Sequence, residues 1–196
     1  MLAPQKKLYA ASEALCGAAL ALLSVSPEDT LLDLGCGNGV ALLLAAQRFG
    51  ARGALGFEIN PERAAETRAA VASAGLSARV DVRTGNALDA SDEDVKGVTC
   101  VYLFLIARGL ALVLPLLRRI AARQPARRLR VVSVLYRIPG VQHLRVEKVF
   151  TGPALMSPVF LYEIDAEGPE PTLSCAGLML GPGAAGFGEG EPAAPG

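Results

Sequence analysis

Histidine is almost absent from this chain: its 196 residues include one, His143. Sites that need several histidines are therefore excluded, among them the common zinc centres and the iron site of two histidines and a carboxylate. A serine triad would depend on His143, and no GxSxG motif supplies its nucleophile. The scarcity of histidine argues against metal centres and triad hydrolysis, and we predict no metal site.

Paired cysteines and a net charge are also missing. The four cysteines lie far apart, without a CxxC motif or a metal-ligand spacing, which favours reduced thiols in an intracellular protein. The formal charge is zero, so composition gives no reason to expect nucleic acid or an anionic membrane as a partner. We expect no nucleic acid, and an intracellular location that is either cytoplasmic or mitochondrial.

Two apolar stretches of the chain could be mistaken for membrane-targeting or membrane-spanning segments. Residues 14–27 resemble a signal peptide, but Glu13 interrupts the leader and the run continues into a strand. Residues 98–117 carry one charge, Arg108, which a spanning helix would place near its midpoint at a cost of about 2.5–3.5 kcal/mol. A buried strand, a loop at 107–109 and an apolar helix explain the same residues without that cost, so we predict no transmembrane segment.

Strand and helix patterns alternate along most of the chain. Helices are expected at about 8–24, 38–49, 61–74 and 109–123. Strands are expected at 30–34, 53–58, 79–84, 98–104, 129–135, 144–151 and 158–164. Near-continuous Val and Leu runs predict a parallel sheet covered on both faces, and the last two strands predict an antiparallel hairpin at one edge. The fold class is therefore α/β, a Rossmann-like three-layer sandwich with a mostly parallel seven-stranded sheet.

These elements divide the chain into three parts. An N-terminal helix occupies residues 1–25, one domain occupies 26–165, and a Gly-, Pro- and Ala-rich acidic tail occupies 166–196. The tail has too little to bury and should be disordered. In the helix at 38–49, the predicted core face comprises Val40, Leu43, Leu44 and Phe49.

The stretch LLDLGCGNGV at 31–40 ends a strand in a glycine-rich turn that is typical of nucleotide sites. A Walker A loop is excluded because no lysine occurs between Lys7 and Lys96. A dinucleotide fingerprint needs GxGxxG, but Val40 takes the place of its third glycine, and Asp33 would oppose a pyrophosphate. S-adenosylmethionine carries a sulfonium and an ammonium where those ligands carry phosphates, and the carboxylate of Asp33 suits that cation.

Polar residues also end the next two predicted strands. Glu58 can accept hydrogen bonds from both ribose hydroxyls, and Asn86 can read the adenine edge. Each residue taken alone is also explained as a turn or capping residue, but three such signals at successive strand ends predict an S-adenosylmethionine site. The predicted cofactor-binding residues are Asp33, Gly35, Cys36, Gly37, Asn38, Glu58, Ile59, Asn60, Asn86, Ala87 and Leu103.

The motif DLGCGNG at 33–39 and the terminal hairpin resemble the class I, seven-stranded S-adenosylmethionine-dependent methyltransferases. GFEINP at 56–61 is similar to the second motif of the protein-lysine methyltransferases that modify mitochondrial carrier and ATP synthase subunits. Asn86 stands where that group usually has an acidic residue. The resemblance implies a methyltransferase domain at 26–165 and a protein lysine as methyl acceptor.

The residues after the fourth strand bear on the acceptor. No [DN]PP[YF] element and no nucleobase signature is present, and the apolar stretch at 101–106 suits a hydrophobic channel. Such a channel lowers the pKa of a lysine and so favours the neutral amine that attacks. Tyr102 and Tyr136 are weak catalytic candidates for orienting the amine, although packing explains both as well. A small-molecule N-, O- or S-methyltransferase and a non-catalytic cofactor-binding subunit remain open as alternatives.

Arginines form the one strong charge cluster, at positions 118, 119, 123, 127, 128 and 130. They either complement a helix C-terminus and face solvent, or dock an acidic protein or an anionic lipid surface. A peripheral membrane contact is therefore left open.

Overall fold

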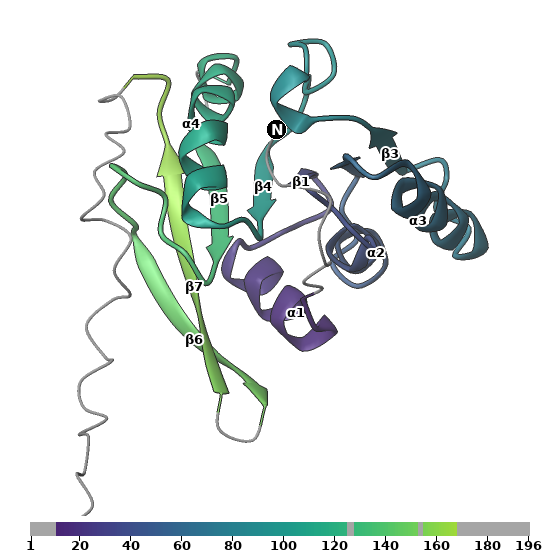
Figure 1. Cartoon of the computed structure of the whole chain (residues 1–196), viewed down its shortest axis with the longest axis horizontal. Helices are drawn as coiled ribbons and strands as arrows, with labels where there is room; N and C mark the ends of the chain where they lie inside the picture. The colour runs from purple at the N-terminus through teal and green to yellow at the C-terminus, as the bar shows by residue number, and fades with distance from the viewer. Residues whose placement is uncertain (1–10, 125–127, 153–154, 168–196) are drawn as a thin grey trace, which may run out of the picture.

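The computed structural model describes residues 11–124, 128–152 and 155–167 (Figure 1). The helices are α1 (Glu13–Leu22), α2 (Val40–Gln47), α3 (Pro61–Ser73), α4 (Ala107–Ala122) and a short 3-10 turn, η1 (Ala87–Asp89). The strands are β1 (Thr30–Leu34), β2 (Gly53–Glu58), β3 (Val80–Thr84), β4 (Cys100–Leu103), β5 (Leu129–Val134), β6 (Arg145–Gly152) and β7 (Leu155–Ile164). The predicted parts that fall in 1–10 and 168–196, including most of the acidic tail, lie outside the described residues.

The strands form one seven-stranded sheet with the order β3-β2-β1-β4-β5-β7-β6. β1 to β5 pair in parallel, whereas β7 is antiparallel to both β5 and β6. The predicted α/β class and the antiparallel hairpin at one edge are confirmed. Because β1, β2, β3 and β4 run the same way, the residues that follow them meet at one edge of the sheet, called the carboxyl edge below.

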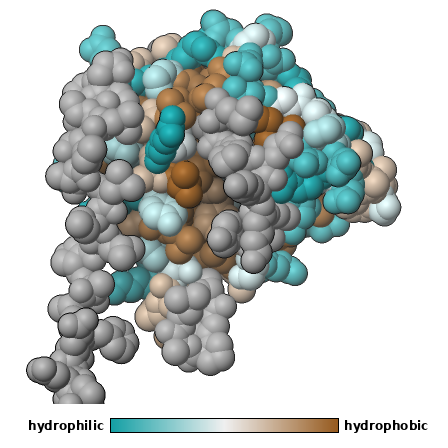
Figure 2. All heavy atoms as spheres, viewed as in Figure 1, coloured by the Kyte–Doolittle hydropathy of each residue, from teal (hydrophilic) through white to brown (hydrophobic). Residues whose placement is uncertain are grey.

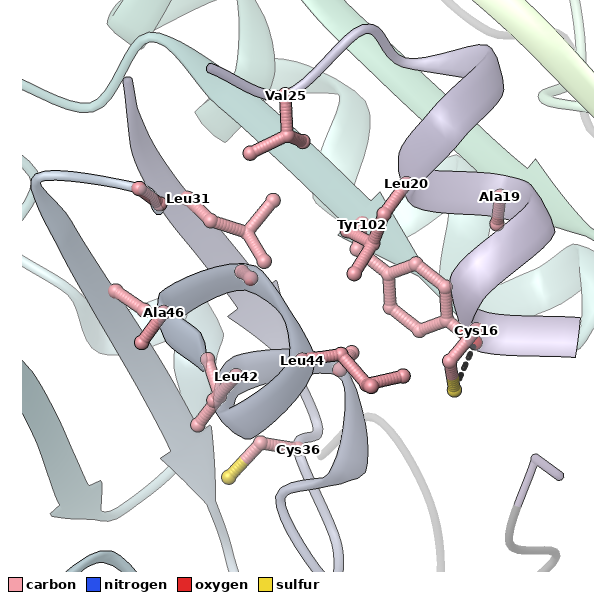
Figure 3. Close-up of a cluster of buried hydrophobic side chains, with 14 of the residues drawn as sticks. Cys16, Ala19, Leu20, Val25, Leu31, Cys36, Leu42, Leu44, Ala46 and Tyr102 are labelled. Carbon is pink, nitrogen blue, oxygen red and sulfur yellow. Dashed lines mark hydrogen bonds between the residues drawn. The ribbon is translucent and has the colours of Figure 1, made fainter. Parts of the chain in front are cut away.

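Two hydrophobic clusters cover the two faces of the sheet. One joins α1, α2 and α3 to the sheet, and part of it is shown in Figure 3. The other joins α4 and η1 to the opposite face. The sandwich therefore has three layers, as the sequence predicts.

Helix α2 corrects one prediction. Its buried residues are Ala41, Leu42, Leu44, Ala45 and Ala46. The predicted core residues Val40, Leu43 and Phe49 are half-buried and pack against the same cluster, so the predicted face was incomplete: of the fully buried residues it included Leu44 alone. The helix packs on the sheet with α1 beside it and is apolar on nearly every side, so its sequence periodicity gives no single direction to the core.

The connection after β4 is a second correction. The predicted loop at 107–109 is wrong, because α4 already begins at Ala107 and Gly109 is buried inside it. A Cβ at Gly109 would lie 3.3 Å from the Cβ of Leu105, so the glycine lets the first turn of α4 pack against the chain that leaves β4. In the described part of the chain, no helix has the length and apolar character needed to cross a membrane.

A buried ion pair holds the opposite edge of the sheet. The side chain of Asp29 is 1% exposed and pairs with Arg130. Asp29 also accepts hydrogen bonds from the Ser26 amide at 2.8 Å and from the Thr99 hydroxyl at 2.8 Å. Burial alone would raise the pKa of Asp29, but the bonds from Arg130, Thr99 and Ser26 outweigh it and lower the pKa.

Most of the arginine cluster is engaged within the chain. Carboxylates of the same chain pair with four of its members, namely Arg119 and Arg123 with Asp92, Arg128 with Glu163 and Asp165, and Arg130 with Asp29. Arg127 lies outside the described residues. The arrangement favours the structural explanation of this cluster over a docking role.

Candidate cofactor site

Three alternating glycines shape the turn that follows β1. Gly35, Gly37 and Gly39 have φ angles of +107°, +54° and +74°, a region that side chains with a Cβ rarely adopt. The amides of Gly35 and Cys36 both donate to the carbonyl of Phe57, each at 2.9 Å, which fastens the turn to the end of β2. The turn then leads directly into α2, with Gly39 as its N-cap.

Thr67 on α3 holds this turn in place, and no sequence motif points to it. Its buried hydroxyl donates to the carbonyl of Gly37 at 2.6 Å. A Cβ on Gly39 would collide with the Cγ2 methyl of Thr67, so glycine is the residue that fits there. A threonine thirty positions along, on another helix, carries no local signal; only the packing of α3 against the turn reveals it.

Asp33 lies at the end of β1 and is 4% exposed. It borders a small hollow lined by Ala11, Cys16, Asp33, Gly35, Cys36, Gly37, Asn38, Val40, Ala41, Tyr102 and Phe104. Burial raises the pKa of Asp33 to about 8, and the nearby carboxylate of Glu58 adds to the rise. Within the described residues no hydrogen bond reaches this carboxylate, so it fits a cationic ligand group that would enter the hollow.

Glu58, at the end of β2, is also buried, at 4% exposed. One of its carboxylate oxygens accepts from the Gly37 amide at 3.0 Å and the other from the Asn60 amide at 2.8 Å. The guanidinium of Arg63 lies 3.3 Å away and offsets the charge. Arg63 and the Asn60 amide both face Oε1, whereas Oε2 keeps a second lone pair, so the same carboxylate can still accept from a ribose hydroxyl.

The remaining predicted residues follow β2 and β3 at the same edge. Asn60 caps α3, accepting from the Arg63 amide at 3.0 Å, and Ile59 beside it is half-buried. Asn86 caps η1, accepting from the Leu88 amide at 3.3 Å. The capping role leaves the side-chain NH2 of Asn86 as a donor for an adenine edge, next to the buried Ala87.

Three predicted residues lie on β4 and β5 or just beyond. Tyr102 is buried beside Asp33, and its hydroxyl lies 3.5 Å from the Cys16 sulfur (Figure 3). Leu103 is fully buried in the α4-side core, and the next residue, Phe104, is the one that borders the hollow. Tyr136 follows β5 and is 39% exposed. The structure thus brings Tyr102 to the predicted cofactor residues and leaves Tyr136 at the surface.

The geometry fits a nucleoside with a cationic end. A buried carboxylate ends β1, a second carboxylate ends β2 and an amide ends β3, around a turn in which the glycines leave room. The residue types match S-adenosylmethionine better than a phosphate-bearing ligand, because the turn presents a buried acid where a phosphate would need cations.

Comparison with known families matches residues 33–145, more than half of the chain, to the ANTKMT methyltransferase domain. The chain belongs to the ANTKMT methyltransferase family. A protein-lysine N-methyltransferase of Saccharolobus islandicus is 33% identical over 145 residues, covering 74% of this chain and 85% of that protein. The resemblance drawn from DLGCGNG and GFEINP is therefore confirmed.

Two other proteins similar to this methyltransferase are named as enzymes that act on RNA. A tRNA1(Val) (adenine(37)-N6)-methyltransferase of Porphyromonas gingivalis is 39% identical over 66 residues, covering 34% of this chain and 26% of that protein. An RNA methyltransferase of Salinibacter ruber, solved with S-adenosyl-L-homocysteine, has a TM-score of 0.69 and 27% identity, covering 82% of this chain and 97% of that one. The expectation that no nucleic acid is involved is not supported by these comparisons.

Proposed function

We propose that this chain is a protein-lysine N-methyltransferase that takes its methyl group from S-adenosylmethionine. The observation that carries the proposal is the Saccharolobus islandicus relative, a protein-lysine N-methyltransferase that aligns over 74% of this chain. The chain after β4 supports it, since Phe104, Leu105 and Ile106 present apolar side chains at the edge where the acceptor approaches.

In this proposal the carboxyl edge divides into a donor side and an acceptor side. On the donor side Asp33 holds the ammonium of the amino-acid end, Glu58 holds the ribose hydroxyls and Asn86 meets the adenine. S-adenosylmethionine supplies a methyl group on a sulfonium, which an amine nitrogen displaces in line. The protein's task is alignment and exclusion of water.

On the acceptor side the apolar residues promote loss of the lysine proton. A free lysine has a pKa of about 10.4, and an apolar surround disfavours the ammonium and lowers that pKa. The proton passes to water before the nitrogen forms its new bond to carbon. Tyr136, at the rim, is better placed than the buried Tyr102 to orient the incoming amine.

RNA methylation is the second candidate, because the Salinibacter ruber protein aligns with 82% of this chain at 27% identity. Methyltransferases that act on the exocyclic nitrogen of a base typically carry [DN]PP[YF] after the fourth strand. This chain has Phe104-Leu105-Ile106-Ala107 there, without a polar group to hold a base nitrogen. The protein substrate is therefore the better supported of the two.

The test is transfer of radiolabelled methyl groups into a cell extract separated into protein, RNA and small-molecule fractions. We expect label in protein, mapped to lysine by mass spectrometry and lost in Asp33→Asn. Lys96→Ala is the matched surface control, because Lys96 is exposed and its ion pair is with Glu93, three residues away. Label confined to RNA or to small molecules would overturn the lysine assignment. Cofactor binding without any label would indicate a non-catalytic subunit.

A further inference from the structure

An apolar surface surrounds the acceptor side and continues along the edge hairpin. Six side chains there are substantially exposed although they are large and hydrophobic, and we call them the rim surface: Ile106, Leu135, Tyr136, Val146, Phe150 and Met156. Phe150 is 70% exposed and Ile106 is 56% exposed. Figure 2 shows hydrophobic surface gathered in the middle of the view, around the lower ends of α4 and β5.

The pairing of the strands brings these residues to one end of the molecule. The Leu135 amide, just past β5, donates to the carbonyl of Pro158 at 2.8 Å. Met156 lies two residues earlier on β7 and pairs with Phe150, so both extend beyond the end of β5. Figure 1 shows the hairpin of β6 and β7 reaching past the tips of β4 and β5. The hairpin therefore stands beside the path by which an acceptor reaches the donor side.

The connection from β5 to β6 explains why this surface is bare. Residues 135–144 form a loop without a helix, so α4 is the helix that covers this face, and it packs on β5 and β7. Within β6, Val146 and Phe150 point to the same face because alternate residues of a strand do. Large exposed apolar areas on a folded domain mark interaction sites.

Cations at the rim surface lack carboxylate partners among the described residues, whereas Glu147, beside Val146 on β6, pairs with Arg145 at 2.8 Å. No Asp or Glu occurs between Asp94 and Glu147, a span that includes the chain after β4 and after β5. Arg108, Arg137 and Lys148 lie in or beside the rim surface, and none of them makes an ion pair with a described residue. Arg108 stands in the first turn of α4, where a cation opposes the helix dipole, so helix stability does not explain it.

We infer that the rim surface docks the protein substrate through a segment that combines apolar side chains with carboxylates close to the acceptor lysine. The inference rests on the proposed function. Carboxylates on the partner would complement Arg108, Arg137 and Lys148, and its apolar side chains would cover Phe150, Met156 and Ile106.

The composition of the surface favours a protein over RNA. Sequence-independent binding of nucleic acid depends on many cations that track the phosphates. Here three cations accompany six large apolar side chains, and most of these are aliphatic. That ratio suits an amphipathic protein segment.

The experiment compares short fluorescent peptides, each with one lysine, for binding to the protein in the presence of S-adenosylhomocysteine at low salt. One peptide flanks the lysine with Leu, Phe and Glu, a second replaces Glu by Arg, and a third replaces Leu and Phe by Ser. We expect the first to bind about tenfold more tightly than either of the others, measured by fluorescence polarisation. Phe150→Ser should weaken binding of the first peptide and leave binding of the third unchanged.

Charge reversal gives the sharper result. In the double variant Arg108→Glu, Lys148→Glu the preference should invert, so that the Arg peptide binds more tightly than the Glu peptide. Lys96→Glu, a reversal on the acidic loop after η1, should leave the preference as it is. Circular dichroism of each variant checks that the fold is kept.

Equal binding of the three peptides, or a preference that survives the double reversal, overturns the inference. Binding of single-stranded RNA or of phosphatidylserine vesicles that depends on Phe150 and Lys148, without a peptide preference, also overturns it and reassigns the surface. The proposed function is read separately, as label in the protein fraction. If proteins are labelled and the peptides show no preference, the inference alone fails. The reverse pattern rejects the lysine methyltransferase and keeps the surface.

Discussion

Gly39 gives the most direct test of how the cofactor turn is held. We predict that Gly39→Ala destabilises the protein far more than Gly75→Ala, although both residues have left-handed φ angles, +74° and +68°. The backbone strain, about 1–2 kcal/mol, is common to both changes. A Cβ at Gly75 would meet nothing within 4 Å, whereas a Cβ at Gly39 would collide with the Cγ2 methyl of Thr67.

The collision sets the expected difference. Overpacking of a buried site costs about 1–3 kcal/mol, so Gly39→Ala should lower the free energy of unfolding by about 2–5 kcal/mol in total. Thr67→Ser removes the Cγ2 methyl and keeps the hydroxyl that donates to the Gly37 carbonyl. Adding Thr67→Ser to Gly39→Ala should therefore recover about 1–3 kcal/mol.

Urea unfolding measures the three variants and the double variant, and calorimetry measures their affinity for S-adenosylhomocysteine. Gly39→Ala should lower the affinity for S-adenosylhomocysteine at least about tenfold, or about 1.4 kcal/mol, and Gly75→Ala should leave that affinity unchanged. The reasoning is refuted if the two glycine variants lose equal stability. It is also refuted if Thr67→Ser recovers nothing.

Two further predictions concern buried carboxylates. Because the pKa of Asp33 is about 8 in the free protein, a cationic ligand has to displace a proton below that pH. Affinity for S-adenosylhomocysteine should therefore rise by up to about tenfold per pH unit toward pH 8 and then level off, and calorimetry should find this slope missing in Asp33→Asn. Arg130→Met leaves Asp29 buried without its partner, so it should lower the free energy of unfolding, measured in urea, by about 3–5 kcal/mol. Arg128→Met, which removes exposed ion pairs, should cost less than about 1 kcal/mol. The pKa of Asp29 is lowered in the folded state, so the stability from its ion pair is present above about pH 4. That stability is lost on acidification through the lowered pKa. The resulting fall in the free energy of unfolding at low pH, the acid limb, should vanish in Asp29→Asn. Equal losses in the two arginine variants, or an acid limb that persists without Asp29, would contradict this account.

The sequence predicted the strand ends that build the site, because a polar residue lies at or just after the end of each of the first three strands. β1 and β2 have the predicted bounds, and parallel pairing then brings Asp33, Glu58 and Asn86 to one edge. Patterns of this kind are local, and the topology does the rest.

The sequence could not show what depends on packing between distant segments. Thr67 acts on the turn through the placement of α3, and a threonine in a helix has no motif of its own. Most of the fully buried residues of α2 were missed for a similar reason, since the orientation of a helix that is apolar all round depends on its neighbours. The rim surface needed the register of β6 and β7, because only that register shows Phe150 and Met156 extending beyond β5.

The hydrogen bonds of Glu58 bear on the thermodynamics of cofactor uptake. Its carboxylate is already held by the Gly37 and Asn60 amides without help from a ligand. A side chain that is fixed beforehand loses little rotational freedom when a ligand arrives, so less of the contact energy is offset by ordering. The donor side should then bind the cofactor with little change in conformation. Conformational adjustment during the catalytic cycle should instead occur in the acceptor and in the surface that it contacts.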